Sequence, residues 1–251
     1  MANSSNSLKS VERSYRILEF VRDNEPVSLT AVSEVLELSK STIHRHLSTL
    51  VSAGYLIRED GQYRVSFEFL SYANQIHLRD PSYPKIKRKV RELADESEEL
   101  VQFTTDEERR LVYLFKETGR NGLLSQSDAR TFRPLHSTAG GKAILSTWPR
   151  EKVEAYIDQN GLEAITEQTI TSPDTLFERL EQVRERGYAT NKEETVEGLG
   201  AISVPVQDQD DSVIGALGIS GPINRVVNDD DEYSQLLLDA KKELELTIRL
   251  L

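Results

Sequence analysis

The apolar pattern of residues 39–54 predicts a helix with one buried stripe. Its apolar residues follow the helical spacing i, i+4, i+7, i+8, namely Ile43, Leu47, Leu50 and Val51. Ser39 can cap the start of the helix with its hydroxyl, and Gly54 stands where a helix that stops takes a left-handed residue. The other face carries no acid and consists of Lys40, Ser41, Thr42, His44, Arg45, Ser48, Thr49 and Ser52. Such a face is typical of a helix in the DNA major groove, although an ordinary solvent-exposed helix also fits.

Two further helices are predicted before this one. Residues 10–23 form the first, with Val11, Tyr15, Leu18 and Val21 facing inward together with Ile17, and Asn24-Glu25-Pro26 ends it. Residues 29–36 form the second, which Thr30 can cap and whose apolar side is Val32, Val35 and Leu36. A short helix, a turn at residues 37–39 and a second helix have the spacing of a helix-turn-helix.

A hairpin follows these helices. Asp60-Gly61 separates two runs that hold aromatic and β-branched residues, 55–58 and 62–65, which is a strong hairpin signal. Three helices and a hairpin in about 65 residues are the pattern of a winged helix, and the order is more specific than any single part. We therefore expect a winged helix-turn-helix domain at residues 1–66 and a linker helix at residues 67–80, which Asp80-Pro81 ends.

The remaining residues, 81–251, predict a second domain of mixed helices and strands. Helices are expected at residues 85–99, 135–146 (after a Gly-containing turn), 150–160, 173–186 and 232–251. Strands are expected at residues 100–104 and 111–115, around a turn at 106–108, at 201–206 and 213–220, and one is expected to start at 122–124. The strands 201–206 and 213–220 flank an acidic turn and predict an antiparallel pair. The fold class is therefore α+β.

Composition narrows the class of protein. The 251 residues have a net charge of −11, which argues against nucleic-acid binding through bulk charge. Residues 1–72 hold 8 basic and 9 acidic side chains, whereas the rest hold 23 and 33, so the acidity belongs to the second domain. Arg outnumbers Lys by 20 to 11 and acids exceed bases by 42 to 31, a balance that suits a halophilic source. The absence of Cys, of a long apolar span and of a signal-peptide pattern predicts a cytoplasmic protein without disulfides or membrane contact.

Several motifs together resemble the IclR family of transcription regulators over nearly the whole chain. In the first domain they are residues 38–45 and 50–56, the recognition helix and its exit. In the second they are residues 134–143, residues 186–189 with Glu193 and Glu194, residues 198–206 and residues 216–222, in the family's order. The resemblance implies a winged helix joined by a linker helix to a GAF-like effector-binding domain, homodimers or homotetramers, and control of catabolic genes.

The resemblance also implies an effector pocket at the matching positions, which are Leu123, Ala139, Gly140, Asn191, Leu199, Ala201, Gly218 and Ser220. The chain departs from the family pattern at Asn191 and Lys192, where many members carry acids. Ala201 and Gly218 are smaller or less polar than some counterparts. We therefore expect an effector different from, or larger than, a two- or three-carbon acid.

Residues 136–143 do not form a nucleotide-binding loop, because His136 and Ala143 stand where that motif needs Gly and Ser or Thr. What remains is a Gly-rich turn that opens a helix, and its free N–H groups suit a carboxylate; a tight helix entry without a ligand is the alternative. Ser220 needs a polar partner in its apolar strand, either a ligand or a backbone carbonyl. The chain offers no convincing catalytic set or cofactor site. Its acidic clusters lack calcium-loop spacing, so no metal site is expected either.

For DNA contact, Arg45 is the first candidate because it points away from the apolar stripe. Lys40, Ser41 and Thr42 near the helix start and His44 follow, and Arg13 and Arg64 are secondary candidates for the phosphate backbone. His46 flanks the stripe and is expected to pack. Two other hypotheses stay open: an enzyme acting on a small metabolite through residues 81–251, and a winged helix that contacts only protein.

Overall fold

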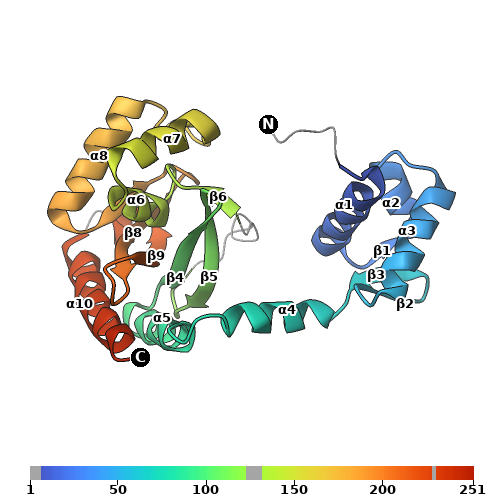
Figure 1. Cartoon of the computed structure of the whole chain (residues 1–251), viewed down its shortest axis with the longest axis horizontal. Helices are drawn as coiled ribbons and strands as arrows, with labels where there is room; N and C mark the ends of the chain where they lie inside the picture. The colour runs from blue at the N-terminus through green and yellow to red at the C-terminus, as the bar shows by residue number, and fades with distance from the viewer. Residues whose placement is uncertain (1–6, 123–131, 228–229) are drawn as a thin grey trace. The chain divides into compact units, whose positions relative to one another are not determined.

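The computed structural model describes residues 7–122, 132–227 and 230–251. The chain divides into two compact units, Met1–Arg79 and Asp80–Leu251. The helix predicted as a linker, α4 (Glu68–His77), is part of the first unit, where the rings of Phe69 and Tyr72 contact Tyr55. A separate linker role for residues 67–80 stays a prediction. Figure 1 gives the order of the elements.

The first unit is a winged helix-turn-helix. Before α4 it contains α1 (Lys9–Asn24), β1 (Val27–Ser28), α2 (Leu29–Val35), α3 (Lys40–Ser52), β2 (Leu56–Glu59) and β3 (Gln62–Val65). The three strands pair antiparallel in the order β1-β3-β2. One apolar cluster joins the helices to the hairpin and includes Ile17, Val21, Val32, Ile43, Leu47, Leu50, Leu56 and Tyr63.

The turn chemistry of this unit follows the sequence. Ser39 caps α3, its hydroxyl accepting a hydrogen bond from the Thr42 N–H at 3.2 Å. Gly54 follows α3 with φ +83°, as a left-handed terminating residue does. Asp60 and Gly61 both have positive φ at the hairpin tip, as a tight hairpin turn that matches the strand twist requires.

Three details of the first two helices differ from the predictions. Val11 and Tyr15 are 46% and 64% exposed, because the core contacts α1 only from Ile17 onward. Val35 is also exposed at the last turn of α2. The cap of α2 is Ser28 and not Thr30, since the Ser28 hydroxyl accepts from the Ala31 N–H.

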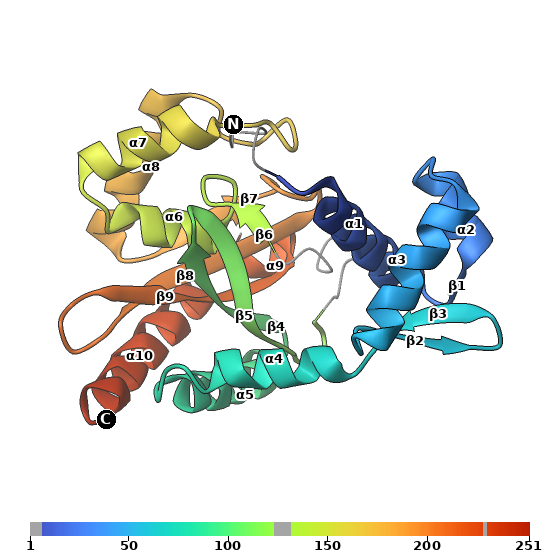
Figure 2. The ribbon, with the colours of Figure 1, turned by 45° about the vertical axis from the view of Figure 1, so that its right-hand side comes forward.

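The second unit is built on a six-stranded antiparallel sheet in the order β6-β5-β4-β9-β8-β7. Its strands are β4 (Leu100–Glu107), β5 (Arg110–Thr118), β6 (Phe132–Pro134), β7 (Ala189–Lys192), β8 (Leu199–Gln207) and β9 (Val213–Pro222). Its helices are α5 (Tyr83–Ser97), α6 (Ala139–Ser146), α7 (Arg150–Asn160), α8 (Pro173–Arg186), α9 (Ile223–Val226) and α10 (Asp230–Arg249). Helices α5 and α10 cover one face of the sheet, and α6, α7 and α8 lie on the other side (Figures 1 and 2). The predicted α+β class is confirmed.

The two faces of the central strands differ in polarity. On β4, Val101 and Phe103 pack into the core beneath α5 and α10, so Gln102 and Thr104 point to the opposite face, because side chains alternate along a strand. On β8 and β9 the same alternation places Ser203 and Ser220 on that opposite face. The apolar face builds the core, and the polar face is left beneath the start of α6.

Some boundaries and short elements of this unit were not predicted. Helix α5 begins at Tyr83, two residues earlier than expected, because proline is tolerated in the first turn of a helix. The turn expected at residues 106–108 lies at Glu108-Arg109, both with positive φ, since β4 continues to Glu107. Strands β6 and β7 and helix α9 were missed, as was β1 in the first unit. The strand expected from residue 122 falls largely on positions 123–124, outside the described residues.

Candidate effector cavity and DNA-binding face

A cavity of about 70 Å³ lies between the polar face of the sheet and the start of α6. Strands β4, β8 and β9 form its floor, β5 and β6 one side, and the segment from β7 to β8 another. Its walls are formed by Gln102, Thr104, Leu111, Tyr113, Arg133, Thr138, Ala139, Gly140, Asn191, Thr195, Val196, Leu199, Gly200, Ala201, Ser203 and Ser220. Most of these side chains are polar, in a region of the unit that is otherwise closely packed.

Two glycines allow α6 to start this close to the sheet. A Cβ on Gly140 would lie 2.5 Å from the Thr104 hydroxyl oxygen, and one on Gly141 would lie 2.1 Å from the Leu135 carbonyl oxygen. Both distances are far below van der Waals contact, so neither position admits a side chain without a shift of the helix. The first turn of α6 can therefore reach the cavity as bare backbone.

The start of α6 presents donors to the cavity. Thr138 caps the helix by accepting the Gly141 N–H at 3.0 Å. Ala139 and Gly140, both on the cavity wall, are the first two residues of the helix, and their N–H groups have no carbonyl one turn earlier within it. The helix dipole adds a partial positive charge at the same end. This arrangement favours an anionic group in the cavity.

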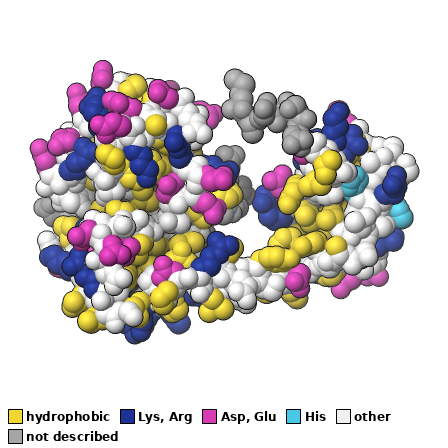
Figure 3. Space-filling view, in the orientation of Figure 1, with side chains coloured by type: hydrophobic (Ala, Val, Ile, Leu, Met, Phe, Trp, Pro, Cys, Tyr) yellow, Lys and Arg dark blue, Asp and Glu magenta, His cyan; other side chains and the backbone are white. Residues whose placement is uncertain are grey.

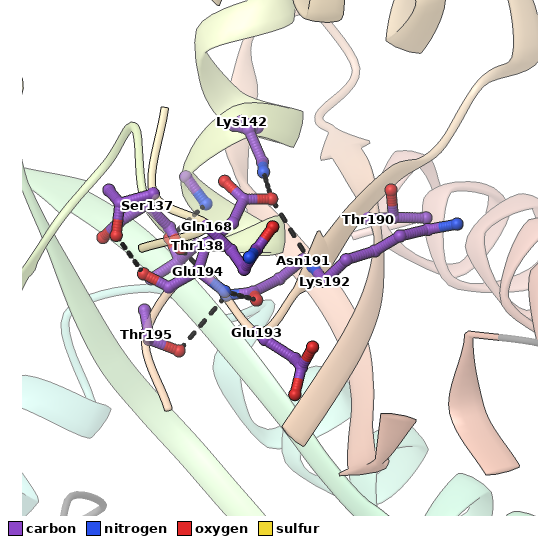
Figure 4. Close-up of polar contacts among 12 residues, drawn as sticks. Ser137, Thr138, Lys142, Gln168, Thr190, Asn191, Lys192, Glu193, Glu194 and Thr195 are labelled. Carbon is purple, nitrogen blue, oxygen red and sulfur yellow. Dashed lines mark hydrogen bonds and ion pairs between the residues drawn. The ribbon is translucent and has the colours of Figure 1, made fainter. Parts of the chain in front are cut away.

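A buried ion pair fixes the rim of the cavity. Lys142 points from α6 to the carboxylate of Glu194, and both side chains are almost completely inaccessible to solvent (Figure 4). Burial lowers the pKa of Lys142 to about 8, although the negative charge of Glu194 opposes this shift. The second carboxylate oxygen, Oε2, of Glu194 is buried without a hydrogen-bond partner among the described residues. The pair holds the segment after β7, which carries the wall residues Thr195 and Val196.

Asn191 lies on the wall, but its side chain forms hydrogen bonds within the protein. Its amide nitrogen donates to the Ser137 carbonyl at 2.8 Å and to the Thr195 hydroxyl at 3.2 Å, and its oxygen accepts the Glu194 N–H at 2.9 Å (Figure 4). Both amide hydrogens are thus used before any ligand enters. Asn191 consequently positions the rim and offers a ligand only its remaining acceptor capacity.

The structure brings six of the eight predicted effector positions together on this wall: Ala139, Gly140, Asn191, Leu199, Ala201 and Ser220. Gly218 is not part of the wall, because the space that a Cβ there would occupy holds the Ser203 hydroxyl, 2.2 Å away. Leu123 lies outside the described residues. Their roles in effector binding stay predictions, since no ligand contact tests them.

Gln102 and Arg133 are wall residues that the sequence did not suggest. Gln102 has a signal in the sequence, because it interrupts the apolar run Leu100–Phe103 and so marks a polar position on one strand face. Arg133 is only 8% exposed although it is charged, and it belongs to a three-residue strand that has no recognisable period. Its approach to the cavity depends on the pairing of β6 with β5.

On the first unit, the outward face of α3 is available for contact as predicted. Lys40, Ser41, His44 and Arg45 are exposed and Thr42 is half-buried. The hydroxyls of Ser41 and Thr42 lie 3.0 and 2.9 Å from that of Ser39 at the helix start. These positions leave the four exposed side chains and the helix N-terminus on the outside of the domain, as a DNA-reading helix requires.

His46 is half-buried and contacts α1. Its Nδ1 lies 2.9 Å from the Ser14 hydroxyl oxygen. Burial lowers its pKa, and the neighbouring cations Arg13 and Arg45 lower it further. The neutral imidazole therefore serves as a hydrogen-bond partner between α1 and α3.

The two secondary candidates have different surroundings. Arg64 forms an ion pair with Glu59 across the wing, so a phosphate would have to compete with this carboxylate. Arg13 lines an open groove of about 830 Å³ together with Thr42 and Arg45. The other wall of the groove is apolar and includes Val11, Tyr15, Leu18, Tyr55, Phe69 and Tyr72. Hydrophobic side chains gather on the face of this unit that Figure 3 shows.

Two family models match the chain. The model of the IclR helix-turn-helix domain matches residues 10–60. The model described as bacterial transcriptional regulator IclR C-terminal matches residues 72–245. The chain belongs to the IclR family.

Individual relatives agree with this assignment. The chain is 30% identical to the HTH-type transcriptional regulator KdgR of Escherichia coli strain K12, over 95% of this chain and 92% of that protein. It is 27% identical to the "Probable HTH-type transcriptional regulator ArcR" of Halobacterium salinarum, over 96% of this chain and 94% of that one. The structure of an IclR homologue from Microbacterium hydrocarbonoxydans, complexed with 4-hydroxybenzoate, has a TM-score of 0.77 at 20% identity and covers 97% of this chain and 100% of its own.

As a member of this family, the chain is a DNA-binding transcription regulator with an N-terminal helix-turn-helix domain and a C-terminal effector-binding domain. The matched relatives are named as regulators of transcription, which favours this function over the enzyme hypothesis. Within the described residues, no helix is long and apolar enough to cross a membrane. The same residues contain no cluster of three or more His, Cys, Asp or Glu side chains that could hold a metal ion.

The buried pair can be tested by a double-mutant cycle. Lys142→Met leaves a buried carboxylate without its partner, and we expect a loss of about 3–5 kcal/mol in the free energy of unfolding. The double variant Lys142→Met/Glu194→Gln should lose clearly less than the sum of the two single variants. Urea unfolding followed by Trp148 fluorescence measures both, since Trp148 is buried in this unit. Lys242→Met, which breaks the exposed Lys242–Asp239 pair, is the control and should cost less than about 1 kcal/mol. Additive losses would contradict a coupled buried pair.

The lowered pKa of Lys142 predicts a pH dependence of stability. Between about pH 8 and its ordinary pKa of 10.5, folded Lys142 has lost its proton while unfolded Lys142 keeps it. The unfolded state then binds more protons, so the contribution of Lys142 to the free energy of unfolding rises with pH in this window. The difference between the wild type and Lys142→Met/Glu194→Gln should therefore increase from pH 7.5 to pH 10. A flat difference would show that the pKa of Lys142 is not lowered.

Proposed function

We propose that this regulator binds a near-palindromic operator as a homodimer and that a small carboxylate in the cavity changes its affinity for that operator. The observation that carries the proposal is a polar cavity in a domain of the effector-binding type. The same chain contains a winged helix whose recognition helix has no acidic residue. Because such a regulator acts on DNA, we place it in the cytoplasm. A catabolic operon is the target class that the family resemblance implies.

For DNA, α3 supplies the reading surface. Its exposed side chains Lys40, His44 and Arg45 can donate to base edges or phosphates, and no carboxylate on α3 repels the backbone. Most of the net negative charge of the chain lies outside residues 1–79. Arg45 is the best candidate for a base contact, because an arginine can bind a guanine edge with two hydrogen bonds.

For the effector, the N–H donors at the start of α6 favour a carboxylate. The cavity volume of about 70 Å³ is several times the roughly 10–15 Å³ that one water needs on this measure. A short acid fits this space with little rearrangement. Gly218 adds no room for the different or larger effector expected from the sequence, because Ser203 fills the space beside it, whereas Ala201 does lie on the wall. The homologue complexed with 4-hydroxybenzoate supports a small organic acid as occupant.

The apolar groove of the first unit supports assembly. Val11, Tyr15 and Tyr72 are all more than 40% exposed along its wall, and an apolar surface of this kind often marks a protein interface. A two-fold dimer would present two α3 helices to successive major grooves about 34 Å apart. Dimers that pair into tetramers agree equally well with these observations.

Arg45→Ala tests the DNA contact. We expect about a ten- to hundredfold weaker affinity for the operator upstream of the gene for this protein or of a neighbouring operon, because one base contact is lost. Fluorescence anisotropy with labelled operator at several salt concentrations measures this. Arg88→Ala on α5 removes the same charge from the other unit and is the matched control, with an expected change below about threefold.

An unchanged operator affinity for Arg45→Ala would overturn the assigned contact and favour a winged helix that binds protein. A protein that binds no DNA specifically at any salt would overturn the regulator proposal as a whole. Equal losses for Arg45→Ala and Arg88→Ala would mean that net charge, and not base contact, controls the affinity.

A further inference from the structure

The polar groups on the cavity wall differ in how far the chain itself satisfies them. The Thr104 hydroxyl donates to the Ala216 carbonyl at 3.3 Å. Thr138 donates to the Leu135 carbonyl and accepts the Gly141 N–H. Asn191 donates both amide hydrogens to groups of the rim, the Ser137 carbonyl and the Thr195 hydroxyl. These side chains shape the cavity and retain little capacity to recognise a ligand.

Gln102 is different. Its amide nitrogen donates to the Ser220 hydroxyl at 2.9 Å, so the two side chains form a pair across the neighbouring strands β4 and β9. Its amide oxygen is buried and has no hydrogen-bond partner in the described part of the chain. If the amide were turned over, its nitrogen would be the group without a partner. In either orientation, one end of a buried amide on the cavity wall is unsatisfied.

An unsatisfied buried polar group is costly, and native proteins seldom keep one without a role. A water could occupy the position in the free protein, since the cavity volume of about 70 Å³ exceeds the roughly 10–15 Å³ that one water needs. A ligand that takes this space must then replace the hydrogen bond of that water or leave the amide unpaired. The wall at Gln102 thus discriminates between ligands that can and cannot bond to an amide.

Three kinds of ligand group can be compared at this position. A second carboxylate offers only acceptors, so it can satisfy the amide nitrogen of the turned-over orientation but not the Gln102 oxygen. An ammonium group would donate to it, but it would lie in a cavity that also contains Arg133 and the positive end of α6. A hydroxyl both donates and accepts, so it satisfies either end of the amide and can also bond to Ser220. Of the three groups, only a hydroxyl can bond to the amide in both of its orientations.

We infer that Gln102 reads a hydroxyl group and that the effector is a short hydroxy acid. The inference rests on the proposed effector function: the N–H groups at the start of α6 hold the carboxylate, and the Gln102–Ser220 pair holds the hydroxyl. Gln102 is a specificity-determining residue in this arrangement. The cavity volume of about 70 Å³ suits an acid of a few carbons.

Matched pairs of acids that differ by one hydroxyl test the inference. Isothermal titration calorimetry on the full chain compares glycolate with acetate, and lactate and 3-hydroxypropionate with propionate. We expect the hydroxy acids to bind about ten- to hundredfold more tightly, because the analogues leave a buried amide unpaired. In Gln102→Met the preference should fall to within about threefold, mainly through weaker binding of the hydroxy acids.

Two controls keep the result interpretable. Gln235→Met removes an exposed glutamine of the same unit, whose amide bonds only to Asp239 on α10 in the described residues, and should retain the full preference. Acetate and propionate binding that survives in Gln102→Met shows that the cavity is intact. If that variant does not fold, the preference of the wild type still decides the ligand class.

The outcomes separate this inference from the proposed function. Equal binding within each pair overturns the hydroxy-acid inference and leaves a carboxylate effector in place. A preference that persists in Gln102→Met overturns the role of Gln102. If no acid of either series binds while Arg45-dependent operator binding is intact, both the hydroxy acid and the carboxylate effector are rejected, and DNA recognition stands.

Discussion

The close approach of helix α6 to the sheet is the contact on which the second unit depends. Gly140 and Gly141 carry no side chains, so the first turn of α6 lies directly against Thr104 and Leu135. This approach closes the cavity and presents backbone donors to it. It also carries Lys142 into the interior, where the ammonium needs a carboxylate partner because an unpaired buried charge is very unfavourable. Glu194 provides this partner and thereby fixes the rim.

The two faces of the sheet divide structural and binding roles. The face beneath α5 and α10 is apolar and forms the larger core. The opposite face carries Gln102, Thr104, Ser203 and Ser220 and tolerates them only because a cavity and mutual hydrogen bonds lie there. The second side also has an apolar cluster with α6, α7 and α8, and the polar side chains are confined to the cavity beneath the start of α6. In the first unit, the stripe of α3 that packs inward likewise leaves the other face free for DNA.

Much of this architecture could be predicted from periodicity and turn chemistry. The helices α3, α7 and α8 and the strand pair β8–β9 lie close to their predicted ranges, and α3 has both a clear apolar stripe and a side-chain cap. Val11 and Tyr15 were assigned inward wrongly, since a helical period does not reveal where the core ends along a helix. Strands β6 and β7 are too short to show a period.

The site was less predictable than the fold. Six of the eight positions implied by the family resemblance lie on the wall, but the roles of individual side chains depend on neighbours that are distant in sequence. Gly218 makes room for Ser203 through the pairing of β8 with β9, and Gln102 meets Ser220 only through the register of β4 with β9. Such pairings follow from sheet order, which local patterns do not specify.

Reciprocal titration measures the proposed coupling between the cavity and the DNA-binding face. Operator affinity is determined with and without saturating glycolate, and glycolate affinity with and without saturating operator. Thermodynamic linkage requires the two ratios to be equal, and we expect a common factor of about five or more in either direction. A factor of one in both titrations, with both ligands bound, would contradict it.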